Sequence, residues 1–542
     1  MPIIDITTMQ GEMPRLAPHL LPESAATVAK NCHFRHGVIT PMMADAGGIK
    51  TFTQKVTTLF RYREDVWFTW PETVEVIRSP VAQDQYGRVY FTDGHSPNVT
   101  SHDVATQGKG TFPSVSHRLG VPAPSHPIDV TRIIPPPDPR DDEPTDDDTR
   151  FYIETYVTGY GEEGSPGPVS LEVTLTHPGS TVLLTLQPPG SQRSNITRRR
   201  IYRSASGGGI AEYLLLVELP IGVLTYQDSS PDNALGPVLE TEDYLMPPDE
   251  MRGLCLMANG IAAGFAGNQV MFSEAYLPYA WPERYKQSTA HDIVAIAPVG
   301  TGLVVGTTGW AYLFSGITPS NITHTQLPVM QACVSRHSMI SMDNFVLYAS
   351  PNGLVSVDTE GNARVATESI IEPRQWRRHF NPDSIKAWPL EGEYLAVYRT
   401  NKGTSAGFIF NPLTMDIRHL TTAFETAFHD LASDTLYTLR ENTLYPSQSS
   451  TKPLPMTWRS KPFLTPVGTS FSCLRIMSEH LNRVGVSLLV DNRQVLSMPP
   501  GTLIDGILRL PAITGRQWEV EVWGYAQVDR ITLSTSMMDM PA

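Results

Sequence analysis

The chain has 542 residues and a formal net charge of −14 at pH 7, from 55 Asp and Glu against 41 Lys and Arg. This acidic balance argues against affinity for nucleic acid, because phosphate binding needs clustered Lys and Arg. It does not exclude a conduit for DNA, since an acidic wall repels phosphate and lets it slide. Only 18% of the residues are charged, which suits either a subunit packed against neighbours or a monomer of low charge.

The four cysteines predict reduced thiols made in a cytoplasm, because none of them forms a close pair with zinc or redox spacing. They are Cys32, Cys255, Cys333 and Cys473. The first residues lack the basic and apolar segments of a signal peptide, and no apolar run has the length of a membrane span. We therefore expect no membrane span.

Residues 1–49 predict an N-terminal arm. A proline-punctuated segment over residues 11–22 favours extended chain. A short helix is expected within residues 22–32, with Ala25, Ala26, Val28 and Ala29 available for packing. The arm either reaches onto a neighbouring subunit or wraps the core of its own chain.

Residues 50–149 are expected to form the first part of a β-propeller, followed by a linker. Apolar, aromatic-rich strands are predicted at 58–62, 66–70, 74–78 and 88–92. Residues 135–148 are acidic and rich in proline, which is typical of a linker or an exposed loop. Their aspartates lack the Gly and the closing Glu of a calcium loop, so we interpret them as a solvated charge run.

Residues 150–245 predict a separate β-sandwich. About seven strands in about ninety residues fit such a fold. The alternating strand at 151–158, the RIYRS strand at 200–204 and the closing Tyr226 and Asp228 resemble a fibronectin type III or immunoglobulin-like domain. Fold likeness by itself implies no activity. The module is expected to be an insertion between propeller blades.

Residues 246–449 predict the remainder of the propeller. Short strands arrive in pairs bounded by Gly, Asn, Asp or Pro, and no run is long enough for a buried helix. The pairs are 260–265 with 269–273, 302–306 with 311–315, 345–349 with 353–358, 394–398 with 407–410, and 435–438 with 443–445. Residues 450–542 predict a C-terminal β-domain with alternating strands such as 517–523. The predicted fold class is thus all-β, with a propeller-like main domain.

No catalytic, cofactor or metal site is expected. Residues 403–407 match Gly-x-Ser-x-Gly, but a strand follows where a nucleophile elbow needs a helix, so we predict a hairpin loop. Glycines 207–209 are interpreted as a hairpin because no Lys-Ser/Thr follows. His33 and His36 lack a third nearby ligand in the sequence.

An arginine cluster and six tryptophans are interpreted as structural residues. Arginines 198–200 form the only tight basic cluster, and without interleaved aromatic residues they predict an exposed strand end, with a weak alternative as a partner contact. Six tryptophans are expected to pack between blades and not to form a ligand platform. These are Trp67, Trp70, Trp281, Trp310, Trp376 and Trp388.

Three groups of segments carry a family resemblance. They are residues 11–26 (GEMPRLAPHLLPESAA) with 29–41 (AKNCHFRHGVITP), residues 78–82 (RSPVA) with 88–93 (RVYFTD), and residues 272–282 (FSEAYLPYAWP) with 349–355 (ASPNGLV). Together they resemble the tail nozzle (tail tubular) proteins of short-tailed bacteriophages. The likeness spans most of the chain, and its motifs are structural turns.

The resemblance implies a virion protein that forms a homo-oligomeric ring of six subunits in the phage tail, made in the host bacterial cytoplasm. Its partners would be the portal, the adaptor of the head–tail connector, and tail fibres or spikes. Genomic DNA would pass through the channel during ejection without sequence-specific binding. From the acidic balance we further expect an excess of Asp and Glu on the channel face.

Two alternatives stay open. A propeller of a tail spike could bind or cleave a host-surface glycan, although no carboxylate pair of the kind that glycoside cleavage normally needs is recognisable in the sequence. A minor tail or adhesion protein could grip a receptor through residues 150–240. Shortened polysaccharide chains would indicate the first alternative, and loss of cell binding on deletion of residues 150–240 would indicate the second.

Overall fold

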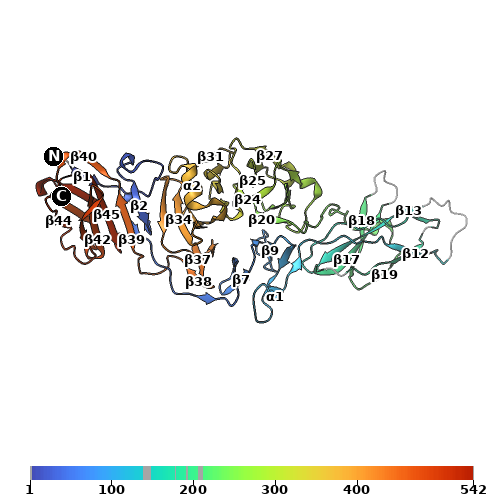
Figure 1. Cartoon of the computed structure of the whole chain (residues 1–542). Helices are drawn as coiled ribbons and strands as arrows, with labels where there is room; N and C mark the ends of the chain where they lie inside the picture. Colours follow the sequence, from blue (N-terminus) through green and yellow to red (C-terminus); the bar gives the residue numbers. More distant parts are fainter. Residues whose placement is uncertain (1–2, 138–147, 178, 191–192, 206–211, 541–542) are drawn as a thin grey trace. The chain divides into compact units, whose positions relative to one another are not determined.

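The computed structural model describes the chain except residues 1–2, 138–147, 178, 191–192, 206–211 and 541–542 (Figure 1). Almost all regular structure consists of β-strands in small antiparallel sheets, so the predicted all-β class is confirmed. The chain divides into two compact units. Unit 1 comprises Met1–Glu72, Val294–Phe314 and His324–Ala542, and unit 2 comprises Thr73–Ile293 and Ser315–Thr323.

Unit 1 contains a series of antiparallel sheets formed by consecutive strands. The first sheet holds β24 (Ile293–Val299), β25 (Gly302–Thr307), β26 (Tyr312–Ser315) and β27 (Thr323–Gln326). The second holds β28 (Ile340–Ser341), β29 (Phe345–Ser350), β30 (Gly353–Asp358) and β31 (Ala363–Val365). The third holds β32 (Lys386–Leu390), β33 (Glu393–Arg399), β34 (Ser405–Asn411) and β35 (Asp416–Leu420). The fourth holds β36 (Thr426–Asp430), β37 (Thr435–Arg440), β38 (Thr443–Pro446) and the N-terminal strand β5 (Lys50–Thr51), and the hairpin of β6 (Thr58–Arg63) and β7 (Val66–Trp70) follows.

Successive sheets of unit 1 pack face to face through separate apolar cores. Leu313 and Val355 belong to the core between the first two sheets, and Ile409 and Leu436 to the core between the third and the fourth. The first strands of neighbouring sheets contact one another, from β28 to β32 to β36 to β6. Sheets that follow each other in sequence and meet along their first strands have the arrangement of propeller blades, and β5 completes the last four-stranded sheet from the other end of the chain.

One buried helix interrupts this pattern, and the expectation of none was wrong. Helix α2 (Pro373–Phe380) begins with Pro at its first turn and a capping box between Glu372 and Gln375. It buries Trp376 and Phe380, four residues apart, in the core between the second and third sheets. Only these two positions are apolar, so eight residues rich in arginine gave no long hydrophobic run.

The arm contains a strand where a helix was expected. Residues 26–30 form β2 (Ala26–Lys30), which pairs with β35 on one side and with β39 (Met456–Ser460) on the other. An isolated helix of this length is marginal in water, whereas two unpaired strand edges supply hydrogen bonds to an extended segment. The helix prediction was therefore wrong because pairing with distant strands overrides local propensity. β3 (Cys32–His33) and β4 (Thr40–Pro41) follow as a short pair.

Strand β2 makes the third blade-like sheet continuous with the C-terminal domain. The resulting ten-stranded sheet runs β32-β33-β34-β35-β2-β39-β45-β42-β43, with β40 paired to β45. Its C-terminal members are β40 (Phe463–Thr469), β42 (Val484–Val490), β43 (Arg493–Met498) and β45 (Gly515–Gly524). A second sheet holds β1 (Ile3–Ile6), β46 (Arg530–Ser534), β41 (Cys473–Met477) and β44 (Ile507–Arg509). Trp458 and Trp518 are buried in their common core.

Unit 2 contains two four-stranded sheets that share one core. They are β8 (Glu75–Arg78), β9 (Val89–Thr92), β10 (Pro97–Thr100) and β11 (His117–Arg118), and β20 (Arg252–Leu256), β21 (Ala262–Ala266), β22 (Gln269–Phe272) and β23 (Gln287–Ser288). Tyr90, Met271 and Trp281 are buried between them, and β8 contacts β20. The short helix α1 (His102–Ala105) follows β10.

Between these two sheets in sequence lies a module of eight strands, β12 to β19. Its sheets are β12 (Asp129–Ile134) with β16 (Thr181–Thr185) and β19 (Thr225–Asp228), β13 (Asp148–Arg150) with β15 (Val173–Leu175), and β14 (Tyr152–Thr158) with β17 (Ile196–Ser204) and β18 (Tyr213–Pro220). β12, which precedes the boundary predicted at residue 150, pairs with β16 of the module. The likeness to a fibronectin type III domain stays a prediction.

Short 3-10 helices lie between these elements. They are η1 (Pro18–Leu20), η2 (Arg35–Gly37), η3 (Asp232–Ala234), η4 (Glu283–Tyr285), η5 (Pro319–Asn321), η6 (Arg336–Ser338), η7 (Pro382–Ser384), η8 (Leu481–Arg483) and η9 (Met537–Asp539). Within the part of the chain that the structure describes, no helix combines the length and the apolar character that crossing a membrane would require.

Candidate functional site

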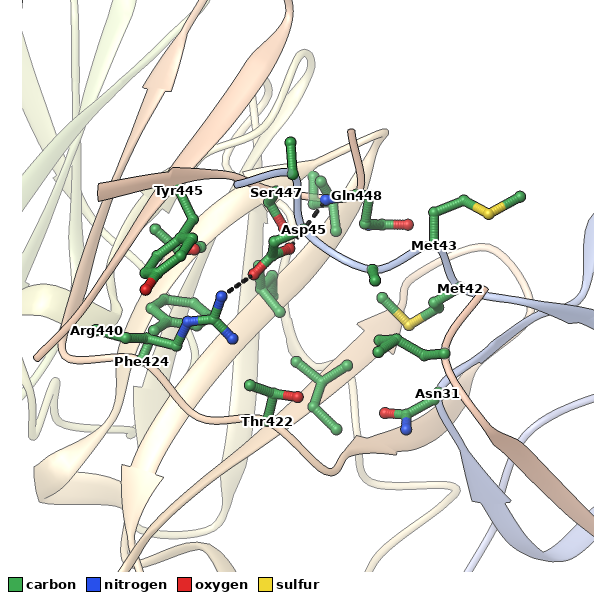
Figure 2. A pocket seen from close by; sticks show the side chains of 17 residues that line it. Asn31, Met42, Met43, Asp45, Thr422, Phe424, Arg440, Tyr445, Ser447 and Gln448 are labelled. Atoms are coloured by element: carbon green, nitrogen blue, oxygen red, sulfur yellow. Dashed lines mark hydrogen bonds and ion pairs between the residues drawn. The ribbon is translucent and has the colours of Figure 1, made fainter. Parts of the chain in front are cut away.

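A pocket of about 260 Å³ lies in unit 1 where the arm meets the third and fourth sheets (Figure 2). Residues 42–46 of the arm form one side, and the ends of β32, β33, β35, β37 and β38 contribute the rest. Six of the apolar residues that line it are Met42, Leu390, Leu395, Leu420, Phe424 and Leu454. These residues also belong to the core between the two sheets, so the pocket is an opening into that core.

An ion pair closes the polar side of the pocket. The Arg440 guanidinium lies 2.7 Å from the Asp45 carboxylate and stacks over the Tyr445 ring at 4.3 Å. The backbone N–H of Gln448 donates to Asp45 Oδ1 at 3.0 Å, as Figure 2 shows. Each charge has an opposite partner, so this end can orient a ligand but does not present an uncompensated charge to it.

Backbone hydrogen bonds hold the arm in place along the pocket. Met42 N–H donates to Asn31 O at 2.9 Å, and Leu454 N–H donates to Met42 O at 2.7 Å. Ala44 N–H donates to Lys452 O at 2.8 Å. Of the two arrangements considered for the arm, this structure shows residues 42–46 bound to the core of their own chain.

The lining residues set the chemistry that the pocket can support. Ser447 is a hydroxyl within it, but none of the described residues that line it is a histidine or a cysteine. The apolar walls suit the binding of an apolar side chain or a small apolar molecule. The site was missed at the sequence level because its walls come from residues about 400 positions apart.

His33 lies beside the pocket in a cluster of buried charges. Its ring nitrogens contact Gln448 Oε1 at 2.9 Å and Arg418 Nη2 at 3.2 Å, and Arg418 is paired with Glu393. Burial and the neighbouring Arg418 lower the pKa of His33, so the imidazole is neutral at pH 7. His36 lies in η2 with a left-handed backbone (φ 56°). Across the described residues, no group of three or more His, Cys, Asp or Glu side chains is placed to hold a metal.

The Gly-x-Ser-x-Gly motif is a hairpin, as predicted. Ser405 is the first residue of β34, and β33 ends at Arg399. Between them, Gly403 N–H donates to Thr400 O and Thr400 N–H donates to Thr404 O, each at 2.8 Å. A strand-to-strand turn of this kind does not have the geometry of a nucleophile elbow.

The arginine cluster at 198–200 is not simply an exposed strand end, and that prediction was wrong for its central residue. Alternation along β17 turns Arg199 inward, where it is fully buried 2.9 Å from Glu154. Arg198 and Arg200 lie on the other face and pair with Glu218. Burial raises the pKa of Glu154 to about 7, and Arg199 offsets this only in part.

The six tryptophans, the acidic segment and the glycine segment singled out in the sequence have the following positions in the structure. Trp67, Trp281 and Trp376 are buried in cores, as expected of packing residues. Trp70, Trp310 and Trp388 are half-buried. Aspartates 141, 142, 146 and 147 and glycines 207–209 lie outside the described residues. Asp148 is described, and it pairs with Arg150 at 2.7 Å.

No family model and no curated protein matches the chain. Among solved structures, it is similar to the extracellular domain of a hybrid two-component system protein from B. thetaiotaomicron, with 10% identity, a TM-score of 0.28 and coverage of 77% of this chain and 41% of that one. It is also similar to the WD40 domain of Toxoplasma gondii coronin (8% identity, TM-score 0.24, 61% and 79% coverage) and to the Neurospora crassa Pan2 WD40 domain (9%, 0.25, 51% and 85%). These likenesses are too distant to carry a functional argument.

Proposed function

We propose that the chain is a structural subunit of a bacteriophage tail nozzle. In this proposal it forms a ring of six copies below the portal and adaptor, closes the tail channel and conducts DNA during ejection. The single observation that carries the proposal is the structural role of the first resembling segment, residues 11–41. That segment contains β2, which joins a blade-like sheet to the C-terminal domain.

Contacts with β35 and β2 explain why glycine and glutamate occur at positions 11 and 12 of this segment. A Cβ on Gly11 would lie 2.6 Å from Ile417 O, so a side chain there would collide with the backbone of β35. Glu12 exchanges two backbone hydrogen bonds with Ile417, at 2.7 and 3.1 Å, and its carboxylate accepts the Ala29 N–H at 2.7 Å. The motif therefore fixes the arm against its own sheet, which suits a rigid framework protein.

Exposed apolar side chains offer surfaces for neighbouring subunits. Leu413 is 89% exposed, Leu431 85% and Ile504 86%. Burial of such side chains at subunit contacts would remove apolar area from water and stabilise the assembly. The low charged fraction of the chain supports the same interpretation.

Counting copies per particle tests the proposal. Quantitative mass spectrometry on purified virions, normalised to the portal, is expected to give about half as many copies as portal subunits, as a sixfold ring below a twelvefold vertex requires. Absence from the particle, or the copy number of a trimeric spike, would contradict the proposal and favour the enzyme or adhesin alternatives.

A further inference from the structure

A second cavity in unit 1, of about 550 Å³, has a cationic lining although the whole chain is acidic. Lys386 comes from β32, Arg399 from the end of β33, and Lys55 from the segment before β6. Among the described lining residues the only carboxylate is Glu425. Three cations therefore meet one anion in a single hollow.

The three cations act on one another. Burial, Arg399 and Lys55 lower the pKa of Lys386, and Glu425 offsets this only in part, so the net environment disfavours the charged ammonium. Its Nζ donates to the backbone oxygen of Glu425 at 3.3 Å. Within the described residues, neither Lys55 nor Arg399 forms an ion pair, and both side chains are exposed. Like charges gathered in this way destabilise the fold unless an anion joins them.

The positive region extends beyond the cavity lining. Burial is the main cause that lowers the pKa of His337 to about 4, and the nearby cations Lys386 and Arg336 lower it further, so this imidazole is neutral at pH 7. Asn442 and Ser405 add neutral side chains that can donate hydrogen bonds to an oxyanion. The combination of several cations with amide and hydroxyl donors is the chemistry that recognises phosphate.

We propose that this cavity binds a polyvalent phosphate-type oxyanion through Lys55, Lys386 and Arg399. A single phosphate group would not fill a hollow of this size, which lies within the range of small-molecule sites, so a diphosphate or a short phosphodiester segment fits better. The assignment rests on charge and geometry within unit 1. It does not depend on the ring proposed above, and either proposal can fail while the other stands.

Thermal unfolding and titration calorimetry of the full chain test this assignment. The probes are pyrophosphate, inorganic phosphate and a short single-stranded oligodeoxynucleotide, each compared with sodium chloride at equal ionic strength so that screening is matched. The test variants are Lys386→Gln, Arg399→Gln and the two combined. Lys452→Gln, an exposed lysine outside the cavity lining, is the matched control.

Pyrophosphate is expected to raise the unfolding midpoint of the wild type and of Lys452→Gln above the chloride value. The dissociation constant should weaken at least about tenfold in each single cavity variant, because each removes a charge-assisted hydrogen bond. In sodium chloride alone, the unfolding midpoint of Lys386→Gln should be no lower than that of the wild type, because the substitution relieves repulsion between cations. This comparison shows whether the variant is correctly folded.

The probes also distinguish the source of the phosphate. Binding of pyrophosphate alone would identify a free phosphate ligand, and binding of the oligonucleotide with the same sensitivity to both substitutions would identify nucleic-acid phosphates. Either result supports the assignment. The absence of any anion-specific shift in the wild type would overturn it, as would a shift that persists in the combined Lys386→Gln and Arg399→Gln variant.

Discussion

The β12–β19 module of unit 2 is antiparallel throughout, whereas the ten-stranded sheet of unit 1 contains one parallel pair, that of β2 with β35. The two regions also differ in how far apart in the sequence their paired strands lie. In the sheet, β2 of the arm joins strands about 390 and 430 positions away, and the adjoining core is apolar. In the module, paired strands lie closer together in the sequence, as Asp129 with Thr185 and Tyr152 with Arg203 show. Arg199, Arg203 and Asp228 of the module are fully buried. Buried charge pairs occur in both regions, since Arg418 of β35 pairs with Glu393 of β33 within the sheet. The feature that sets the sheet apart is its long-range pairing through the arm.

This difference predicts which substitutions should destabilise each region. A buried charge that loses its partner costs far more than an exposed one, because the remaining charge stays desolvated. When a strand that pairs with a distant segment detaches, the chain between the two segments regains conformational entropy, which favours the detached state. Substitution of a buried charge should therefore destabilise the module, and changes in the arm should destabilise the ten-stranded sheet.

The largest expected effect is that of Arg203→Ala. This substitution leaves Asp228, which is fully buried 2.7 Å from Arg203, short of its closest cation. We expect the free energy of unfolding of the module to fall by about 3–5 kcal/mol, measured by hydrogen exchange of β14, β17 and β18. Arg198→Ala in the same strand removes a pair with a 42% exposed arginine and should cost less than about 1 kcal/mol. Equal effects of the two substitutions would contradict the account.

Asn31→Ala tests the anchoring of the arm. Asn31 has a left-handed backbone (φ 49°), and its amide donates to Thr421 Oγ1 at 2.6 Å and to Pro455 O at 3.0 Å. Loss of these buried bonds together with backbone strain should lower the stability of unit 1 by about 2–4 kcal/mol, measured by chemical denaturation. Asn31→Gly should recover about 1 kcal/mol, since only the strain is relieved. A loss within experimental error would show that the arm is not needed.

Glu154 should make the stability of the module depend on pH. Its pKa is raised from 4.5 to about 7 in the folded state, so the folded state binds more protons than the unfolded state in this window. The contribution of Glu154 to stability is then largest below pH 4.5 and is lost as the pH rises to 7. The stability difference between the wild type and Glu154→Gln should change by about 3 kcal/mol across the window, measured by hydrogen exchange at each pH. A constant difference would refute the assigned environment of Glu154.

The smallest expected effect is that of Ser405→Ala. Ser405 is exposed at the start of β34, so the substitution should change stability by less than about 0.5 kcal/mol. Any hydrolysis of a generic ester by the wild type should be unchanged in the variant. An activity that disappears with Ser405→Ala would reopen the nucleophile interpretation.

Within residues 246–449, the central strands of each sheet were predictable from sequence, and the edge strands were not. The predicted pairs correspond to the second and third strands of each sheet, such as β33 and β34, whose buried residues form an apolar run. The missed β27 reads Thr-His-Thr-Gln and is exposed throughout, so no local signal marks it. An edge strand of this kind is extended because it hydrogen-bonds to the neighbouring strand, and the sequence alone does not identify that neighbour.

The errors at functional candidates have the same physical origin. Ala25, Ala26 and Ala29 favour a helix locally, yet the edges of β35 and β39 draw residues 26–30 into a strand. Arg199 suggested an exposed cluster until strand alternation placed it beside Glu154. Both cavities combine residues from the two ends of the chain, and spacing in the sequence gives no access to such a combination.

A cryo-electron reconstruction of the intact tail tests the central claim most directly. The account predicts six copies of this chain in a closed ring below the adaptor, with Asp and Glu outnumbering Lys and Arg on the surface that faces the channel. Three copies in a lateral spike, no copy in the tail, or a channel lined by Lys and Arg would contradict it.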